Sequence, residues 1–508
     1  MPLINSIVSW LMKKRMHQIE LFMQYPEEVQ HEWFVRLLDT AKDTEFGKKY
    51  GFAYITSEAE YKMRVPIQEY DEFMPYIERL RKGERDLLWP GEIRWFAKSS
   101  GTSGGKSKFI PVSQDSMNDC HFKGGKDMLS LYCNAYPQTH LFDGKTLSLS
   151  GSYKEDEHNI YARNGDLSAI LLENLPTWAE FFRAPEASIA LMSEWEEKMD
   201  KIAQAIMREN ITCVSGVPSW MMVLLRHTLK ISGKKRVADI WPDLEVFIHG
   251  GVNFDPYEEQ FKSLFKPLDV NLWEVYNASE GFFGIQDSLN RNDLLLMLDY
   301  GIYYEFLPVK NLADRSPTLS LSEVKEGEDY ALIISTSGGL WRYMIGDTIR
   351  FTSLSPHRFI ITGRIRNFIN AFGEELIMDN AEKALLTACE RTGALVSEYT
   401  VAPVYMNDDS QGAHEWLIEF EAAPSNMSYF AEVLDNALKS LNSDYEAKRY
   451  KDFTLKLPII TSLPKGTFYE WMKIRGKLGG QNKVPRLYNN RKHADEILRI
   501  INKEAYVK

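Results

Sequence analysis

The 508-residue sequence lacks the cysteine and histidine patterns that build common metal and disulfide sites. Its four cysteines are widely separated and form no CxxC pair, and its ten histidines include no HExxH motif. These absences exclude the common zinc motifs and a disulfide framework. Free cysteines usually behave as small buried apolar residues. We therefore expect reduced, buried thiols in a cytoplasmic protein at Cys120, Cys133, Cys213 and Cys389.

The sequence also lacks an excess of positive charge. Its 60 Lys and Arg residues are outnumbered by 71 Asp and Glu residues, which gives a formal net charge of −11. Proteins that bind nucleic-acid phosphates normally carry clustered excess Lys and Arg. We therefore predict no nucleic-acid partner. Any polyanionic ligand must be held by a local group of residues rather than by the overall field.

Long apolar runs are absent as well. No window approaches the ~20 apolar residues of a membrane span. The apolar segment Ile4–Met12 is followed, not preceded, by Lys13, Lys14 and Arg15, and no small-residue cleavage site comes after it. This order is the reverse of a secretory signal. The segment is more typical of an amphipathic helix packed on the protein, so we expect no integral membrane contact.

The chain does contain enough apolar sequence for more than one core. Its 44 % hydrophobic content is typical of a folded globular protein. A chain of this length exceeds what one ordinary core holds. From Ile4 to Ala41 apolar residues recur at helical spacing, interrupted by Pro26. We predict two helices here, followed by a loop at Asp43–Gly47.

The middle of the chain alternates helical and strand-like segments. Helices are predicted at 193–209 and 218–229, and buried strands at 211–214 and 244–249. Such alternation is typical of parallel sheets covered by helices, in which ligands bind beyond the carboxyl ends of the strands. The predicted fold class is therefore α/β, with parallel-sheet sub-lobes in a large N-terminal domain.

The pattern changes near Gly363. A helix, two strands, a helix, a strand and a helix follow, which make a small α+β unit of about 140 residues, a usual size for a domain. We place the boundary here. The N-terminal domain is then predicted at residues 1–363 and the C-terminal domain at residues 364–508.

A glycine-rich segment, SSGTSGGKSKFIP, runs from Ser99 to Pro111. Its three glycines allow backbone N–H groups to converge, and its hydroxyl and lysine side chains add donors and positive charge. Such a nest suits the oxygens of an oligophosphate. A flexible surface linker is the alternative, although strand-like segments on both sides disfavour it.

This segment differs from a Walker P-loop. Only three residues separate Gly101 from Gly105-Lys106, whereas the Walker pattern requires four. The exit at Phe109–Pro111 is also extended rather than helical, because a proline disfavours the α region for the residue before it. The pattern therefore disfavours a P-loop kinase or GTPase.

Two later motifs carry residues suited to a nucleotide. In Tyr276–Gly281, a tyrosine at a strand end can lie flat on a purine, and Glu280 can bind Mg²⁺. In Gly338–Asp347, the final aspartate, at an apparent strand end, can accept both ribose hydroxyls. The alternatives are a solvated loop capped by Ser279 for the first motif and a turn aspartate for the second.

Taken in order, the three motifs resemble those of the auxin-responsive acyl-acid amido synthetase family, a branch of the adenylate-forming superfamily with firefly luciferase and acyl-CoA synthetases, and we expect a bacterial member. The matching segments are Ser99–Pro111, Tyr276–Glu280 and Arg342–Asp347, with further similarity at Thr44–Phe52 and Asn482–Arg486. One departure is Asn277-Ala278, where the family more often has glycine or small hydroxyl residues.

The resemblance implies an AMP-forming ligase that uses ATP and Mg²⁺ in two steps. An acyl acid attacks the α-phosphate of MgATP to give an acyl adenylate and pyrophosphate. An amine, expected to be an amino acid, then displaces AMP to form an amide. Two alternatives remain, an acyl-CoA ligase with the same first step and a non-catalytic ATP-binding protein. The sequence leaves the acid, the amine and the oligomeric state open.

The resemblance also implies roles for the matching residues. Tyr276 is expected at the adenine, Glu280 at the catalytic Mg²⁺, and Asp347 and Arg364 at the ribose. Lys483 is expected to be the catalytic lysine that a mobile C-terminal domain swings onto the α-phosphate and the acyl carboxylate; a surface lysine is the alternative. The other expected nucleotide-binding residues are Ser99, Ser100, Gly101, Thr102, Ser103, Lys108, Asn277 and Ser279, of which Ser100, Thr102 and Ser103 are expected at the β- and γ-phosphates.

Overall fold

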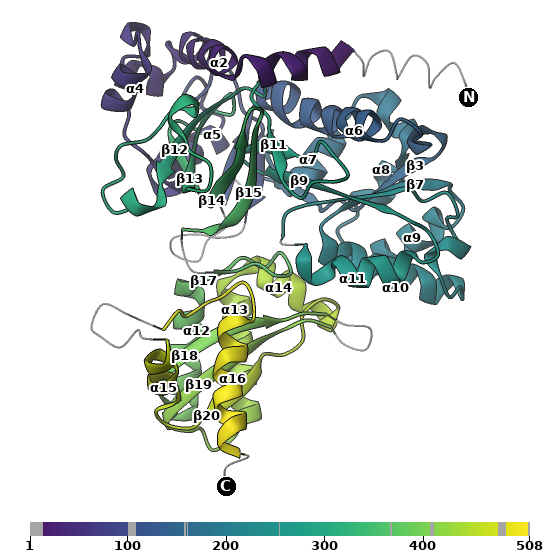
Figure 1. Cartoon of the computed structure of the whole chain (residues 1–508), viewed down its shortest axis with the longest axis vertical. Helices are drawn as coiled ribbons and strands as arrows, with labels where there is room; N and C mark the ends of the chain where they lie inside the picture. Colours follow the sequence, from purple (N-terminus) through teal and green to yellow (C-terminus); the bar gives the residue numbers. More distant parts are fainter. Residues whose placement is uncertain are drawn as a thin grey trace.

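The computed structural model describes residues 14–99, 108–156, 159, 161–252, 254–365, 368–406, 411–475 and 484–505. Figure 1 shows them as a large part, up to residue 365, above a smaller part that begins at residue 368. The buried apolar residues of the large part form clusters that are separate from those of the smaller part. Each part therefore has its own core.

The N-terminal region is helical, as predicted. Residues 14–24 form a helix, and α2 (Pro26–Ala41) follows with a proline at its first turn, where no intrahelical N–H is required. The predicted loop at Asp43–Gly47 is wrong, because α3 (Glu45–Tyr50) begins there. Thr44 caps this helix by accepting a hydrogen bond from Gly47 N at 3.0 Å, and Gly51 ends it with a φ of 67°.

The described residues of the large part build an 11-stranded sheet in the order β12-β13-β14-β15-β11-β10-β9-β8-β7-β3-β6. Neighbouring strands are parallel from β6 to β9, which confirms the predicted α/β class. They are antiparallel from β9 to β12. No α-helix separates these strands in the chain, so the alternation of helices and strands did not predict this half of the sheet. The strands are β3 (Lys145–Ser148), β6 (Arg183–Ala184), β7 (Ile211–Gly216), β8 (Val246–His249), β9 (Asn271–Ala278), β10 (Gly281–Ile285), β11 (Leu294–Leu296), β12 (Ile302–Pro308), β13 (Asp329–Thr336), β14 (Tyr343–Leu354) and β15 (His357–Arg364).

A second sheet of the large part has the order β2-β1-β5-β4. Its strands are β1 (Trp95–Ser99), β2 (Lys108–Val112), β4 (Tyr153–Glu155) and β5 (Arg163–Gly165). β1 and β2 are antiparallel, with Ser99 opposite Lys108. This pairing confirms the extended flanks of the glycine-rich segment and places Ser99 beside Lys108.

Helices cover both faces of the parallel strands. Val246 and Ile248 of β8 belong to one apolar cluster, whereas Phe247 belongs to another, with Met221 of α10 and Phe261 of α11. Figure 1 shows α10 and α11 along one face of these strands and α6 on the other side. The helices that follow α3 in this part are α4 (Glu58–Arg64), α5 (Tyr70–Arg81), α6 (Lys123–Ala135), α7 (Leu167–Glu173), α8 (Ala187–Ala190), α9 (Trp195–Ile206), α10 (Pro218–Ser232) and α11 (Asp255–Phe265).

The smaller part is an α+β unit around the sheet β18-β19-β20. Trp416 and Ile418 of β19 belong to the cluster that contains residues of α12 and α13, whereas Leu417 belongs to the cluster with α15 and α16. The sheet is therefore covered by helices on both faces. The elements are β16 (Phe368–Ile369), β17 (Leu376–Ile377), α12 (Met378–Thr392), β18 (Leu395–Val404), β19 (Ala413–Ala422), α13 (Met427–Leu441), α14 (Ser443–Arg449), β20 (Ile459–Leu463), α15 (Thr467–Ile474) and α16 (Lys492–Ala505).

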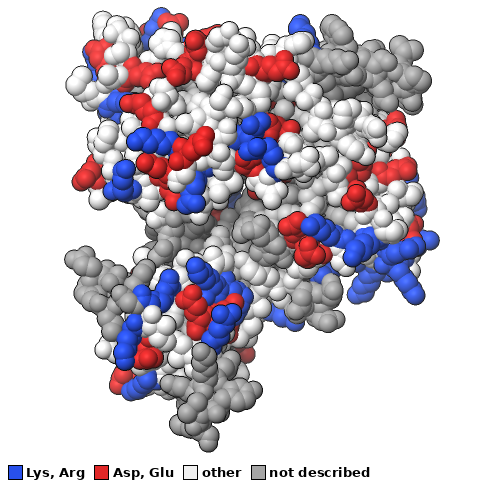
Figure 2. All heavy atoms as spheres, in the orientation of Figure 1, with Lys and Arg blue, Asp and Glu red and all other residues white. Residues whose placement is uncertain are grey.

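The surface charge and the helix lengths can be compared with the sequence analysis. On the face shown in Figure 2, acidic and basic side chains are interspersed over both parts. Among the described residues, no helix is both long and apolar enough to span a membrane.

The four cysteines are free; Cys120 and Cys213 are buried, whereas Cys133 and Cys389 are half-buried. The expectation of full burial therefore holds for two of the four.

Candidate active site

Two of the predicted motifs meet near the carboxyl end of β9. Tyr276 donates a hydrogen bond through its hydroxyl to Asp347 Oδ2 at 2.5 Å, and each residue is 5 % exposed. The ring of Tyr276 packs against Phe283 of β10 and Phe359 of β15, with ring centres 4.9 and 6.1 Å away. The packed rings hold the tyrosine in place, and its hydroxyl in turn orients the carboxylate of Asp347.

The expectation that Asp347 lies at a strand end is wrong. It lies inside β14, because Tyr343 and Met344 before it already pair with β13. Its backbone is in register with Arg364 at the end of β15. The strand pairing therefore places the backbone of Arg364 beside the predicted ribose-binding aspartate.

Glu280 lies in the turn between β9 and β10 and is half-buried. Tyr343 donates a hydrogen bond through its hydroxyl to Glu280 Oε1 at 3.4 Å, and Lys108 Nζ donates one to the Tyr343 hydroxyl at 3.3 Å. Lys108 is the first residue of β2, at the exit of the glycine-rich segment. The three motifs therefore converge on one place.

Tyr343 is a member of this group that the sequence patterns did not single out. It is fully buried, and the Nζ atom of Lys108 lies 6.0 Å from the centre of its ring. Its hydroxyl joins the lysine to Glu280. The available signal was its position in the third motif, four residues before Asp347 on what proves to be one strand.

Arg342, the residue before Tyr343, belongs to the scaffold instead. Its guanidinium forms a bidentate ion pair with Glu305, at 2.9 Å for both hydrogen bonds, and the two residues are 5 % and 1 % exposed. It also donates hydrogen bonds to the backbone oxygens of Lys62 at 2.9 Å and Val65 at 2.5 Å. The hydrogen-bond acceptors of the Arg342 guanidinium are therefore groups of the protein itself. These hydrogen bonds connect the start of β14 to β12 and α4.

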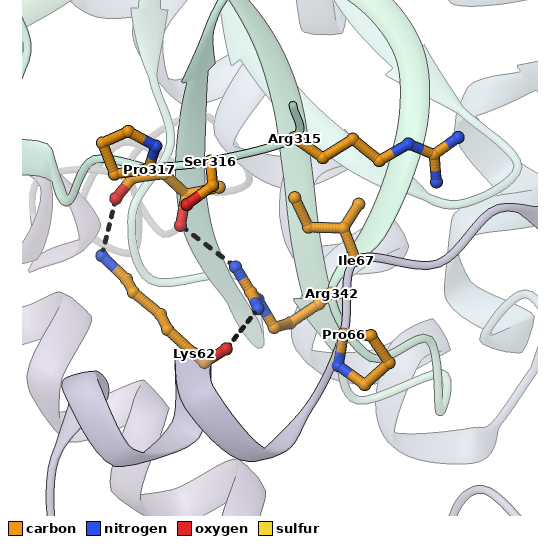
Figure 3. A pocket seen from close by; sticks show the side chains of 8 residues that line it. Lys62, Pro66, Ile67, Arg315, Ser316, Pro317 and Arg342 are labelled. Atoms are coloured by element: carbon orange, nitrogen blue, oxygen red, sulfur yellow. Dashed lines mark hydrogen bonds between the residues drawn. The ribbon is translucent and has the colours of Figure 1, made fainter. Parts of the chain in front are cut away.

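A pocket of about 380 Å³ opens beside Arg342 (Figure 3). Figure 3 shows Lys62 and Arg342 held by hydrogen bonds, with Arg315 extended away from Arg342. Arg315 pairs with Glu69 at 2.5 Å. The residues that line the pocket include none of Tyr276, Glu280 or Asp347. The pocket is therefore separate from the candidate active site.

The end of the neighbouring strand β8 is apolar and tightly packed. The ring of His249 stacks on Phe254 with centres 3.7 Å apart, and burial lowers the pKa of this imidazole to about 3. In the described part of the chain its Nδ1 atom has no hydrogen-bond partner. At Gly250, a Cβ atom would lie 2.3 Å from the Val275 backbone oxygen, so only glycine fits beside β9. A neutral imidazole therefore stands next to the strand that carries Tyr276.

Other predicted site residues can be placed only in part. Asn277 is exposed at the end of β9, and Ser279 is half-buried in the turn before Glu280. The backbones of Ser99 and Arg364 are in strands. The remaining predictions lie outside the described residues, namely Ser100, Gly101, Thr102, Ser103 and Lys483.

The side chains of the candidate active site suit a metal ion that is bound together with a nucleotide. Among the described residues, no three His, Cys, Asp or Glu side chains gather into a cage for a metal. Mg²⁺ that is held by substrate phosphates needs only one or two protein carboxylates. Glu280, half-buried and near Lys108, suits that requirement.

Comparison with solved structures defines the class of fold. The chain is similar to an acyl acid amido synthetase, AtGH3.15, in complex with 2,4-DB, with a TM-score of 0.63, 18 % identity and coverage of 96 % of each chain. It is also similar to 2-hydroxyisobutyryl-CoA ligase in complex with 2-HIB-AMP and CoA, with a TM-score of 0.59, 11 % identity and coverage of 96 % of this chain and 93 % of the other. The fold is therefore that of the adenylate-forming ligases.

Sequence comparison defines the family. The GH3 family N-terminal domain matches residues 15–270, the central domain residues 295–364 and the C-terminal domain residues 379–492. The chain thus belongs to the GH3 family, as its motifs predicted. It is 25 % identical to indole-3-acetic acid-amido synthetase GH3.3 of Arabidopsis thaliana, over 93 % of this chain and 91 % of the relative. It is 23 % identical to 4-substituted benzoates-glutamate ligase GH3.12 of the same plant, over 84 % and 87 %.

Proposed function

We propose that this protein uses ATP to join a carboxylic acid to an amine. In the first step the acid attacks the α-phosphate of ATP, which gives an acyl adenylate and pyrophosphate. In the second step an amine, proposed to be an amino acid, displaces AMP and forms an amide. The observation that carries the proposal is the convergence of Tyr276, Asp347, Glu280 and Lys108 from three separate motifs. Membership of a family whose named relatives are amide-forming ligases supports it.

The hydrophobic and acidic half of the cluster suits the nucleoside. Tyr276 is held by aromatic packing, and we assign it, together with its neighbours Asn277 and Ser279, to the adenine. A carboxylate has several acceptor positions, so Asp347 can bind a ribose hydroxyl while it keeps the hydrogen bond from Tyr276. We assign Arg364, opposite Asp347 in the sheet, to the same sugar.

The charged half of the cluster suits the phosphates. A carboxylate substrate and a triphosphate repel each other, so catalysis requires positive charge at the phosphorus under attack. Lys108 supplies part of it, and we assign Ser99–Ser103 to the phosphate oxygens and Lys483 to the α-phosphate. Glu280 would hold Mg²⁺, which neutralises phosphate charge when bound.

Exchange of labelled pyrophosphate into ATP tests the first step without the amine. We expect at least one acid, in a screen of benzoates, indole-3-acetate and fatty acids, to support exchange by the full chain. Glu280→Gln should lower the exchange rate by about 100-fold, because it removes the charge proposed to hold Mg²⁺. Asp347→Asn should raise the KM for ATP by about tenfold, since it weakens a charged hydrogen bond.

The control is Asp329→Asn, which changes an acidic residue of the same sheet whose carboxylate pairs with Arg350. It should leave exchange unaltered. If no acid supports exchange while ATP still binds, the proposed enzyme activity is refuted and the non-catalytic alternative stands. If exchange occurs and CoA, but no amino acid, accepts the acyl group, the protein is an acyl-CoA ligase instead.

A further inference from the structure

The pocket beside Arg342 is built from three segments that are distant in the sequence. Lys62 lies in α4, Pro66 and Ile67 follow that helix, and Arg342 directly precedes β14. Residues 315–318, in the connection from β12 to β13, complete the lining. The volume of about 380 Å³ lies within the range of small-molecule sites. The pocket can therefore enclose a small organic molecule.

The charged residues of the lining are all basic, namely Lys62, Arg315 and Arg342. The two arginines are paired, Arg342 with Glu305 and Arg315 with Glu69. In the part of the chain that the structure describes, Lys62 has no carboxylate partner. Its Nζ atom donates a hydrogen bond to the backbone oxygen of Thr318 at 3.1 Å. An ammonium group has three donors, so Lys62 keeps both charge and donors for a ligand.

Arg342 shapes the pocket, but its guanidinium is fully engaged by the protein. It donates two hydrogen bonds to Glu305, two to backbone oxygens and one to the Thr318 hydroxyl at 3.1 Å. These bonds use all the N–H donors of a guanidinium. The Thr318 hydroxyl is engaged as well, because it donates a hydrogen bond to Glu305 Oε1 at 2.6 Å. Lys62 is therefore the residue of the lining that best suits an anion.

The remaining lining is mainly apolar. Pro66, Ile67 and Pro317 contribute aliphatic surface, and Ser316 adds a hydroxyl. Figure 3 shows Pro317 on the same side of Arg342 as Lys62, with Pro66 and Ile67 on the other side. One unpaired cation among aliphatic side chains favours a ligand with a single negative charge and an apolar body. A phosphate or nucleotide would bring further charges for which the lining has no partner.

The two arginines of the lining have an unusual backbone conformation. The φ angle is 51° at Arg315 and 44° at Arg342, in the left-handed region that long side chains rarely adopt. At Arg342, hydrogen bonds on both sides of the residue impose it. The Arg342 N–H donates to the Ser335 hydroxyl at 3.0 Å, and Gln68 N donates to the Arg342 backbone oxygen at 3.0 Å. Strain of this kind clusters at ligand sites and switch regions.

Backbone hydrogen bonds join the wall of the pocket to the candidate active site. Gln68 follows the lining residues Pro66 and Ile67, and its backbone oxygen accepts a hydrogen bond from Met344 N at 2.9 Å. Together with the bond from Gln68 N to Arg342, this contact pairs Gln68 in parallel with Tyr343. Tyr343 is the residue whose hydroxyl connects the lysine and the glutamate of the candidate active site. A ligand on this wall therefore acts on the segment that positions Tyr343.

We propose that this pocket binds a small monocarboxylate with an apolar body, and that this binding tightens the binding of ATP at the separate candidate active site. The Lys62 ammonium pairs with the carboxylate, and Pro66, Ile67 and Pro317 contact the apolar body. The bound ligand stabilises the pairing of Gln68 with β14 and so the position of Tyr343. The pocket is independent of the proposed function, whereas the effect on ATP rests on it.

Isothermal titration calorimetry of the full chain tests the site. The probes are benzoate, its neutral counterpart benzamide, and inorganic phosphate. We expect the wild-type protein to bind benzoate, and to bind the other two probes about tenfold more weakly. Lys62→Met removes the charge and keeps an unbranched side chain, so it should weaken benzoate binding by about tenfold. The matched control is Lys325→Met, at an exposed position outside the pocket, which should leave binding unaltered.

The effect on ATP is measured with α,β-methylene-ATP, which cannot form an adenylate. We expect saturating benzoate to tighten the binding of this analogue and Mg²⁺ by about fivefold in the wild type. The tightening should disappear in Lys62→Met. It should also disappear in Ser316→Trp, which fills the pocket from an exposed position. Both variants should bind the analogue alone as the wild type does, which shows that they are folded.

The outcomes are distinguishable. Equal benzoate binding by the wild type and Lys62→Met, or none by the wild type, would refute the site. Benzamide or phosphate binding as tight as that of benzoate would refute the assigned class of ligand. A benzoate effect on the analogue that is absent from the wild type, or that persists in Lys62→Met, would refute the coupling. Failure of the wild type to bind the analogue at all would instead refute the proposed function.

Discussion

Arg342 and Tyr343 are adjacent in the chain, but they have different roles. The tyrosine hydroxyl contacts Lys108 and Glu280 in the candidate active site. The arginine is turned to Glu305, and both members of that ion pair are almost completely buried. Burying two charges is costly unless each is paired, so removing one partner leaves the other uncompensated. The motif therefore combines a site residue with the residue that holds its strand.

Arg342→Met tests this at the residue scale. We expect the free energy of unfolding to fall by about 3–5 kcal/mol, because Glu305 would remain buried without its partner. Urea denaturation followed by tryptophan fluorescence measures the change. The matched control is Arg315→Met beside the same pocket, whose exposed ion pair with Glu69 should contribute under ~1 kcal/mol. Equal effects of the two substitutions would contradict the scaffold role of Arg342.

At the scale of elements, α6 shows how closely a helix approaches the sheet. A Cβ atom at Gly124 would lie 2.5 Å from the ring of Phe282, at the start of β10. At Gly125, one residue further along the same helix, a Cβ atom would meet nothing within 4 Å. The first glycine is therefore required by packing, whereas the second only lowers the helix propensity.

We predict opposite changes in the free energy of unfolding when alanine replaces these two glycines. Gly124→Ala should lower the free energy of unfolding by about 1–3 kcal/mol, because the ring of Phe282 and the helix must move apart. Gly125→Ala should raise it by about 0.5–1 kcal/mol, because alanine loses less conformational entropy in a helix. Chemical denaturation of both variants decides the matter. A loss of stability in both, or in neither, would show that α6 does not pack as described.

At the scale of the whole molecule, two separately cored parts meet at the edge of one sheet. The clusters that contain Leu332 and Leu434 have no residue in common. The contacts between the parts include hydrogen bonds from Tyr257 and Gln260 of α11 and the approach of Lys448 of α14 to the ring of Trp220 in α10. Interfaces of that kind allow domains to move relative to each other, which a two-step reaction in one site would use.

We expect calorimetry to resolve two unfolding transitions. Leu434→Ala, at a fully buried position in α13, should lower only the transition of the smaller part, by about 2–5 kcal/mol. Leu332→Ala, at a fully buried position in β13, should lower only the transition of the large part. If either substitution shifted both transitions equally, the two parts would unfold as one unit and the proposed boundary near Gly363 would fail.

The sequence alone determined much of the element order and the chemistry of the site. Helical periodicity around Pro26 and the alternation in the middle of the chain are local signals, and the helices and parallel strands follow them. The signals of α3 are local too, since Thr44 and Gly51 are ordinary helix caps, although the segment was predicted as a loop. The chemistry of each motif could also be predicted from a short segment of sequence, because each motif contains residue types that suit phosphate, purine or Mg²⁺.

Only the tertiary structure decided which residues meet. The hydroxyl of Tyr276 finds Asp347 71 residues away because the order of strands in the sheet brings them together. Arg342 finds Glu305, 37 residues away in the chain, for a similar reason. Strand order and the docking of the smaller part depend on packing between distant segments. No local pattern encodes those choices, so the residue types were evident from the sequence and their partners were not.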